Sequence, residues 1–342
     1  DALAVLAIVL LAALARFGSL MHIGLRGDEA VYAGQAGMLA GDQELSRYFL
    51  PISRGNTNFL LYQYIVALAY RLAGVGEVPA RVVSVIFSTL TVPVLLELGR
   101  TLYSKRVGYI AAVALALSGY AVGLGRLALL DATLVFFFVL ALLFAAKWVR
   151  TGQAAWLYGG AAMAALAMQV KITGVLAVMA FAAFLAITGQ YRALDRQTVA
   201  LSLMVFLVCS PLAFLMFIRH GSLFVEFLSQ SIRRESRVPW YYYGRLLLSY
   251  EGYLIPLLWV PGLLLALWRR SIGDLFVLLW ASVVLAFFQA YPLKAFNYLL
   301  PLVPALCLLT ARLLDAITQR LAWKPAMVGS MVAGLVVLGA PQ

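Results

Sequence analysis

Two adjacent carboxylates, Asp28 and Glu29, follow closely on the first apolar run of the sequence. Such charges repel each other and lose solvation at a membrane boundary, which favours proton uptake by one of them. A carboxylate whose pKa is raised in this way can take a proton from a hydroxyl or amine nucleophile. The pair could equally chelate a divalent metal. The alternative is structural, with Asp28 as the N-cap of a helix that begins at Glu29.

A third carboxylate, Asp131, lies at the start of a long apolar run. An ionisable side chain within a membrane span costs about 2.5 kcal/mol or more at the helix centre, and is by default functional. Arg126 lies nearby in the sequence. A structural ion pair between Arg126 and Asp131 is therefore the alternative to a role in chemistry.

Two lysines lie in short turns between apolar runs. Lys171 occurs in the sequence Lys-Ile-Thr-Gly, and its ammonium suits a phosphate as a compact point charge. The alternative is that Lys171 extends toward the lipid headgroups while its stem stays in the apolar layer. Lys294 and Tyr298 stand together at a later turn.

The composition indicates that a membrane surrounds these residues. Of the 342 residues, 64% are hydrophobic and 12% are charged, whereas soluble domains average about 45–50% apolar and about 25% charged residues. The net charge of +12 comes from Lys and Arg in short clusters between apolar runs, as in loops that flank membrane spans. No nucleic-acid partner is expected. Cys209 and Cys307 lie inside apolar runs and are expected to be small core residues.

Eleven runs approach the length of about 20 apolar residues that a membrane-spanning helix needs. They are residues 2–17, 79–99, 107–124, 131–149, 154–170, 172–188, 198–218, 248–268, 274–290, 297–314 and 326–340. A further run, 59–74, is shorter and contains Gln63. The first run starts at Asp1, so it is expected to be an uncleaved span or the start of a trimmed chain.

The positive-inside rule decides whether 59–74 crosses the membrane. If this run lies flat at the interface, five basic clusters share one side: Arg100/Lys105/Arg106, Lys147/Arg150, Arg192/Arg196, Arg269/Arg270 and Arg312/Arg320/Lys324. If it crosses, the series is split between the two sides. The expected fold is therefore all-α, a polytopic transmembrane helix bundle of about 11 spans, with a cytoplasmic N-terminus and juxtamembrane helices in the first external loop.

This topology predicts one transmembrane domain, residues 1–342, with two long external loops, residues 18–78 and 219–247. The second loop breaks the positive-inside trend, since it contains Arg219, Arg233, Arg234, Arg237 and Arg245. An external basic loop indicates an anionic partner, either lipid phosphate or substrate phosphate. A solvated amphipathic loop is the alternative.

The same topology brings the polar residues singled out above to the extracytoplasmic face of the membrane. Carboxylates and cations gathered on one face indicate a site for an amphiphilic, phosphate-bearing substrate.

The ordered set of motifs resembles that of the C-type membrane glycosyltransferases, and most of all the branch with the aminoarabinose transferases and protein O-mannosyltransferases. The resembling segments are residues 26–32 (RGDEAVY), 126–137 (RLALLDATLVFF), 171–174 (KITG), 239–243 (PWYYY) and 294–304 (KAFNYLLPLVP). Each segment is a weak signal alone, but together they recur in the same order across nearly the whole chain.

The resemblance implies a polyprenyl-phosphate-linked sugar as donor and a lipid, glycan or protein acceptor outside the cytoplasm, at the plasma (inner) membrane. It implies that Asp28 is the catalytic carboxylate near the acceptor, assisted by Asp131, with Glu29 nearby. Lys171 and the second-loop arginines would hold the donor phosphate. The residues expected at the phosphate are then Lys171, Arg126, Arg233, Arg234, Arg237 and Lys294, and those expected in the substrate cavity are Tyr32, Tyr241, Tyr242 and Tyr298.

The chain departs from the family pattern at two places. The aminoarabinose transferases have an acidic, proline-rich stretch where this chain has residues 51–58 (PISRGNTN). Arg54 and Asn56 are poor metal ligands, so a divalent metal remains an open question. Those relatives also continue into a C-terminal extracytoplasmic domain, so the chain is expected to be a shorter member or part of a longer protein.

The function expected from the sequence is sugar transfer with inversion at the anomeric carbon, with Asp28 as the base. A transporter or flippase for an isoprenoid-linked or anionic lipid is the first rival, because it would use the same cavity and cations without a base. A non-catalytic scaffold is the second rival, and it leaves the carboxylates on one face unexplained.

Overall fold

The computed structural model describes residues 1–18, 20, 24–52, 58–233, 238–252 and 256–320, and in these ranges the chain is helical, with no strand. The α-helices are α1 (Ala2–Phe17), α2 (Asp28–Ala40), α3 (Leu45–Tyr48), α4 (Leu61–Ala73), α5 (Glu77–Leu102), α6 (Lys105–Leu117), α7 (Gly119–Gly125), α8 (Leu130–Thr151), α9 (Ala154–Val170), α10 (Leu176–Thr188), α11 (Arg196–Val208), α12 (Pro211–Arg233), α13 (Tyr242–Glu251), α14 (Pro256–Arg269), α15 (Ile272–Ala290) and α16 (Val303–Arg320). Short 3₁₀ turns are η1 (Ile172–Val175), η2 (Gln190–Ala193) and η3 (Leu300–Leu302).

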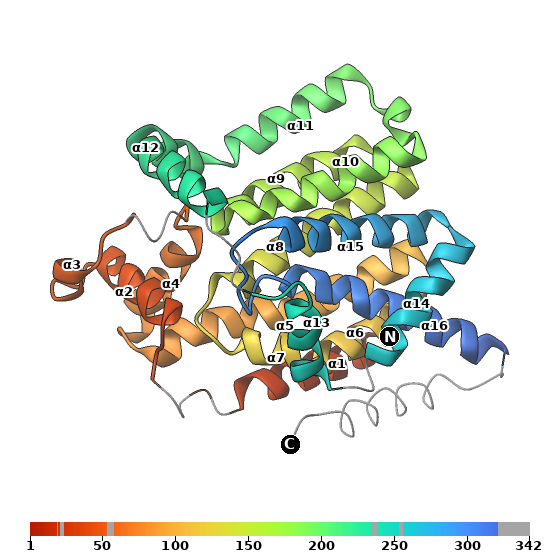
Figure 1. The fold of residues 1–342 in the computed structure, drawn as a ribbon, viewed down its shortest axis with the longest axis horizontal. Coiled ribbons are helices and arrows are strands. Elements are labelled where there is room, and N and C mark those ends of the chain that lie inside the picture. Colours follow the sequence, from red (N-terminus) through yellow and green to blue (C-terminus); the bar gives the residue numbers. More distant parts are fainter. Residues whose placement is uncertain (19, 21–23, 53–57, 234–237, 253–255, 321–342) are drawn as a thin grey trace.

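The core is a set of apolar helices that run along the long axis of the molecule (Figure 1). Helix α8 packs between α5 and α9, and α6 packs against both α5 and α16. Close approach needs small residues: a Cβ on Gly99 of α5 would lie 2.8 Å from the Cα of Gly108 in α6. The paired glycines thus let the two backbones touch.

The number of spans expected from the sequence is not confirmed. Four helices are long and apolar enough to cross a membrane: Glu77–Leu102, Leu130–Thr151, Ile272–Ala290 and Leu300–Arg320. The described part of the chain has up to seven if three bent helix pairs count as one span each, and it also has three shorter apolar helices. The candidate run 326–340 lies outside the described residues. The structure is thus a polytopic helical bundle, and its described residues contain four to seven candidate spans.

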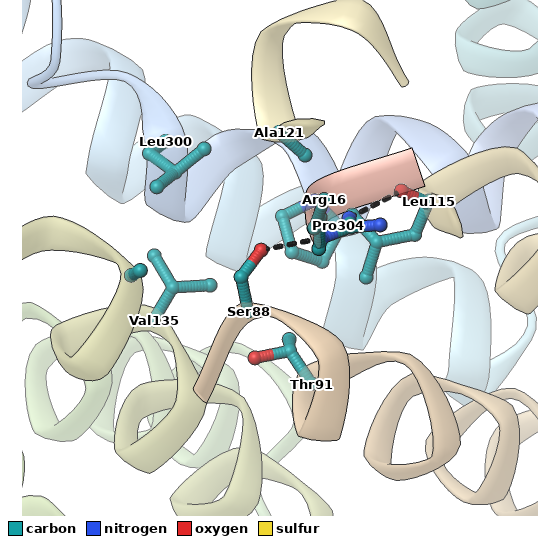
Figure 2. Close-up of a pocket in the computed structure, with 9 residues that line it drawn as sticks. Arg16, Ser88, Thr91, Leu115, Ala121, Val135, Leu300 and Pro304 are labelled. Atoms are coloured by element: carbon teal, nitrogen blue, oxygen red, sulfur yellow. Dashed lines mark hydrogen bonds between the residues drawn. The ribbon is translucent and has the colours of Figure 1, made fainter. Parts of the chain in front are cut away.

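A bend of 57° between α6 and α7 explains why the apolar run 107–124 is not one straight helix. Ser118 ends α6 and caps α7, because its side chain accepts a hydrogen bond from the backbone of Ala121. The carbonyls freed at the end of α6 are bound by the fully buried Arg16, which donates to Ala116 and to Leu115 (Figure 2). The bend therefore has both its new helix ends satisfied.

Arg16 also donates to Ser88 Oγ at 2.7 Å, which ties α1 to α5 beside a cavity of about 10 Å³ (Figure 2). The guanidinium has carbonyl and hydroxyl partners in place of a carboxylate. Its charge lies at the C-terminal end of α6, where the helix dipole is negative. Arg16 is therefore a structural joint of three helices.

The run 59–74 forms α4, whose 13 residues span about 20 Å at 1.5 Å per residue. Helix α4 packs against α2 at one end of the molecule, with α3 and α12 nearby (Figure 1). Phe59, just before α4, stacks on Phe224 of α12 with ring centres 5.1 Å apart. This helix is too short to cross a bilayer core of about 30 Å, in line with the interfacial placement expected from the sequence.

The segment 219–247 is more regular than the loop that the sequence suggested. Helix α12 continues through it to Arg233, with a kink at His220, and α13 begins at Tyr242. The outward sides of α11 and α12 carry exposed apolar residues, among them Leu203, Phe217 and Ile218. Apolar side chains exposed on both helices fit a lipid environment.

Ion pairs mark the opposite end of the bundle. Lys147 at the end of α8 pairs with Glu97 near the end of α5 at 3.3 Å, and Arg312 of α16 lies 3.5 Å from Asp274 at the start of α15. Lys105 pairs with Asp1. Basic residues from separate loops of the sequence therefore gather at one end, away from α2, α4 and α12.

Candidate active site

Asp131 is the centre of a buried polar cluster. It is the second residue of α8, and its side chain is 2% exposed. Lys171 Nζ donates to Asp131 Oδ1 at 2.8 Å, and the amide of Asn297 donates to Oδ2 at 2.6 Å. Each carboxylate oxygen thus has a donor. Asp131 pairs with Lys171, and not with Arg126 as the structural alternative from the sequence had it.

Lys171 owes its position to a tight turn at the end of α9. It is the C-cap of α9, in extended conformation, and η1 then folds back on the last turn of the helix. A Cβ on Gly174 would lie 2.3 Å from the carbonyl carbon of Ala167. Only glycine permits this approach, so the Lys-Ile-Thr-Gly sequence has a physical reason: Gly174 closes the turn that presents the Lys171 ammonium.

An aromatic face covers the ammonium of Lys171. Its Nζ lies 4.7 Å from the ring centre of Tyr298, a distance at which a cation is attracted by the ring face. Tyr298 in turn packs on Phe288, with ring centres 5.2 Å apart. The Lys171 side chain is 13% exposed, so the charge is shielded from most of the solvent but still accessible.

Lys294, which the sequence placed at the donor phosphate, makes hydrogen bonds to backbone carbonyls in the structure. Its Nζ donates to the carbonyls of Phe288, Gln289 and Tyr291, at 2.7, 2.5 and 2.8 Å. These carbonyls belong to the end of α15, where a cation is favoured by the helix dipole. Burial lowers the pKa of this ammonium. With three acceptors engaged, Lys294 caps α15, and a role at the phosphate stays a prediction.

Asp28 is an exposed carboxylate at the start of α2. The N-cap of that helix is Gly27, so Asp28 does not cap it as the structural alternative proposed. Among the described residues no hydrogen bond or ion pair holds its side chain. Negative charge is favoured at this helix end, and Asp28 remains available to a substrate.

Tyr32 and Tyr298 connect Asp28 electrostatically to the buried cluster. Burial raises the pKa of Tyr32 well above its usual value, and the charges of Asp28 and Asp131 raise it further, while a hydrogen bond from Asn58 opposes them. Burial likewise raises the pKa of Tyr298, with smaller contributions from Asp131 and Asp28. Both phenols therefore stay neutral at physiological pH, and the two carboxylates act on the same pair of rings.

Hydrogen bonds to the surrounding helices hold the carboxylate of Glu29. Arg81 of α5 donates to both of its carboxylate oxygens, at 3.1 and 3.3 Å. The backbone N–H of Ala128 donates to Glu29 Oε1 at 2.8 Å. Glu29 thus joins α2, α5 and the segment before α8, and its oxygens are occupied. It fits a role in holding Asp28 and Asp131 in place better than one in the chemistry.

Arg126 is a half-buried cation at the end of α7. Its Nε is buried and lacks a hydrogen-bond partner, and no ion pair to Arg126 is found in the described part of the chain. A terminal nitrogen lies 3.3 Å from where a Cβ on Gly18 would stand. An uncompensated, partly buried cation of this kind favours an anionic ligand, consistent with the expected phosphate role.

The residues expected from the second loop are less well defined. Arg233 is exposed at the end of α12, whereas Arg234 and Arg237 lie outside the described residues. Tyr241 is exposed and Tyr242 is half-buried, on the first turn of α13. Their place in a substrate cavity stays a prediction.

In the ranges that the structure describes, no three His, Cys, Asp or Glu side chains lie close enough together to bind a metal ion. Glu29 already has three donors on its oxygens. Asp28 alone does not make a metal site. Arg54 and Asn56, which bear on this question, lie outside the described residues.

Sequence reasoning missed Asn297, Arg81 and Glu251. Glu251 is 3% exposed and accepts hydrogen bonds from Ser118 Oγ and from the backbone of Tyr120, so it caps α7 from α13. The signal for Arg81 and Glu251 was present, since each is a charge inside a predicted span. Asn297 carried no comparable signal, because an amide beside a turn is common.

A protein-family model matches the middle of the chain. The model of the dolichyl-phosphate-mannose-protein mannosyltransferase family matches residues 58–214. This range includes α4, Arg81, Asp131 and Lys171. None of the curated proteins matches the chain in sequence.

Solved structures match nearly the whole chain. The crystal structure of ArnT from Cupriavidus metallidurans bound to undecaprenyl phosphate superimposes with a TM-score of 0.77 at 21% identity, over 97% of this chain and 63% of that one. The apo form of the same protein gives 0.76 at 23% identity, over 96% of this chain and 63% of that one. The chain has the C-type membrane glycosyltransferase fold.

A more distant member of this fold is the oligosaccharyltransferase of Archaeoglobus fulgidus, in complex with Zn and sulfate. It gives a TM-score of 0.67 at 14% identity, over 99% of this chain and 54% of that one. The chain thus spans less than two thirds of the length of these C-type glycosyltransferases. The resemblance inferred from the ordered motifs is confirmed at the level of the fold.

Proposed function

We propose that the protein transfers a sugar from a polyprenyl-phosphate donor to an acceptor on the extracytoplasmic side of the membrane, with inversion at the anomeric carbon. One observation carries the proposal: the Lys171 ammonium is paired with Asp131 and lies over the ring of Tyr298, which is within electrostatic range of Asp28, a carboxylate without a partner among the described residues. A base and an anion-binding cation at one place are what glycosyl transfer from a lipid phosphate requires.

In this mechanism Asp28 accepts the proton of an acceptor hydroxyl as its oxygen attacks the anomeric carbon. The bond between that carbon and the phosphate oxygen breaks, and its electron pair leaves on the polyprenyl phosphate. A single displacement inverts the configuration. An acceptor that is already anionic, such as a phosphate, would be oriented by Asp28 without proton transfer.

Lys171 and Arg126 are the cations that meet the charge developing on the leaving phosphate. Lys171 donates to Asp131 at 2.8 Å, and a bound phosphate would take over part of its hydrogen bonding. Arg126 has no such partner to release among the described residues. Donors fixed in a water-poor site stabilise developing charge more than the same groups in water do.

The compared proteins support the class of donor. The ArnT structure holds undecaprenyl phosphate, and a structure of the archaeal oligosaccharyltransferase AglB holds an inhibitory peptide and a dolichol-phosphate. A lipid phosphate is therefore a reasonable ligand for this chain. A further structure of the Archaeoglobus fulgidus oligosaccharyltransferase is tethered with an acceptor peptide, which supports protein among the expected acceptor classes of lipid, glycan and protein.

The charge distribution supports the extracytoplasmic placement of the site. The basic clusters with Lys105, Lys147 and Arg312 lie at the end of the bundle opposite Asp131. The positive-inside rule assigns that end to the cytoplasm. The site and its acceptor then face the outside, in the plasma (inner) membrane.

The function is tested with detergent-solubilised protein incubated with a polyprenyl-phosphate sugar and candidate acceptors. A transferase releases polyprenyl phosphate, whereas a flippase or transporter does not. Asp28→Asn is expected to abolish release while the protein stays folded, because an amide cannot accept the acceptor proton. Retained turnover in Asp28→Asn would remove the base from this role.

A further inference from the structure

Asn297 and Tyr298, which are neighbours in the sequence, contact the two halves of the Lys171–Asp131 ion pair. Asn297 donates to Asp131 Oδ2 at 2.6 Å, and the ring of Tyr298 lies under Lys171 Nζ at 4.7 Å. Asn297 is 4% exposed. Asn297 thus contacts the carboxylate of the ion pair, and Tyr298 contacts its ammonium.

The hydrogen bond from Asn297 determines where Asp131 turns its second oxygen. With Oδ2 on the amide, Oδ1 points to Lys171, and the ammonium is placed 2.8 Å away. Without the amide, a buried oxygen would lose its donor, and the carboxylate would rotate to share Lys171 or seek another partner. The position of Lys171 therefore depends on Asn297 through Asp131.

The loop that carries Asn297 is fixed from three helices. Lys294 binds it to the end of α15 through three carbonyls. The hydroxyl of Tyr120 in α7 donates to the carbonyl of Phe296, and Trp280 Nε1 in α15 donates to the carbonyl of Pro301 at 3.1 Å. Asn297 itself completes the attachment at α8. A loop held in this way can set the geometry of a side chain that it contacts.

We propose that Asn297 is a positioning residue of the donor-phosphate site, because it orients Asp131 and thereby holds Lys171 where the lipid phosphate binds. The inference rests on the proposed function. Asn297 acts through Asp131 and Lys171, not through contact with the reacting atoms. Asn297, from the loop 291–299, thus joins Asp131 and Lys171 as a third residue of this site.

The test is a double-mutant cycle on the binding of undecaprenyl phosphate to the purified protein. Asn297→Ala is expected to weaken binding about tenfold, the size of effect expected when a hydrogen bond to a charged group is lost. In a Lys171→Ala background the same change is expected to have no further effect, because the residue through which it acts is gone. The donor KM is expected to rise more than kcat falls.

A second variant and a matched control separate loss of binding from loss of stability. Asn297→Asp keeps the side-chain size but removes the donor and adds a carboxylate beside Asp131. Lys171 would then face two acids, so phosphate binding is expected to weaken at least as much as in Asn297→Ala. Gln63→Ala is the matched control: Gln63 is also a buried amide, bonded to Gln35 Oε1, and its loss is expected to lower thermal stability without changing the dissociation constant of the folded protein.

The outcomes separate the two proposals. Wild-type protein that binds no undecaprenyl phosphate would overturn the proposed function and this inference together. Wild-type binding with an equal loss from Asn297→Ala in both backgrounds would overturn the inference alone, since Asn297 would then act independently of Lys171. A fall in thermal stability with unchanged affinity would reduce Asn297 to a structural residue.

Discussion

Asp28 and Glu29 are adjacent in the sequence but differ in solvent exposure and in their partners. Asp28 is exposed at the start of α2 with no described partner, whereas the Glu29 side chain is 7% exposed and paired with Arg81. A free carboxylate can act as a base, and a buried paired one supports the fold. The two residues should therefore respond to substitution in opposite ways.

Glu29→Gln is expected to lower the free energy of unfolding by about 3 kcal/mol, because the buried guanidinium of Arg81 loses its buried counter-charge and keeps the more exposed Glu77, 3.6 Å away. Thermal unfolding of the purified protein in detergent measures this loss. Asp28→Asn is the matched control, since an exposed unpaired side chain changes stability by about 0.5 kcal/mol or less. Equal stability of the two variants would contradict the scaffold role of Glu29.

At the scale of elements, short turns decide where the charges lie. The turn η1 folds onto the end of α9 and presents Lys171, while the bend between α6 and α7 is held by Arg16 and leads toward Arg126. Helix α7 is capped at its start by Glu251 from α13. The long helices provide the frame, and the breaks between them position the site.

Gly174→Ala is expected to weaken undecaprenyl phosphate binding by about tenfold or more, because the added Cβ would lie 2.3 Å from the backbone of Ala167 and force η1 and Lys171 to shift. Binding assays on the purified variant measure the effect. Gly221→Ala in α12 is the control: no atom lies within 4 Å of its Cβ position, so the change is expected to leave binding intact. Wild-type affinity in Gly174→Ala would show that the turn adapts without moving Lys171.

At the scale of the whole molecule, the bundle separates its charges between two ends. The carboxylates and cations of the site come from α2, the start of α8 and the end of α9, whereas Lys105, Lys147 and Arg312 make their ion pairs at the start of α6, the end of α8 and the start of α15. Because the first end carries the proposed acceptor site, its exposure to the outside of the cell is the decisive property.

Cysteine labelling in intact cells tests this orientation. Tyr241 and Tyr191 are matched in exposure, 51% and 50%, and belong to opposite ends of the bundle. In a background where Cys209 and Cys307 are replaced by Ala, a membrane-impermeant maleimide is expected to label Tyr241→Cys and to spare Tyr191→Cys until the cells are opened. The reverse pattern would place the site in the cytoplasm.

The sequence by itself determined the membrane class, the helical fold and the family resemblance, because apolar composition and short ordered motifs are local properties of the chain. It did not determine the number of spans, since a single residue such as Ser118 can bend an apolar run without making it less apolar. Similarly, the sequence indicates that Lys294 is a free cation, whereas in the structure its ammonium donates hydrogen bonds to the carbonyls of Phe288 and Tyr291.

The tertiary structure decided which charges are free and which are paired. Lys171 is 40 residues from Asp131, and Asn297 is 166 residues from it, so no spacing rule could pair them. Glu29 and Arg81 are likewise 52 residues apart. Burial makes such pairings obligatory, because a charge without a partner in the apolar interior costs several kcal/mol, but only the packing of the helices determines which partner each charge meets.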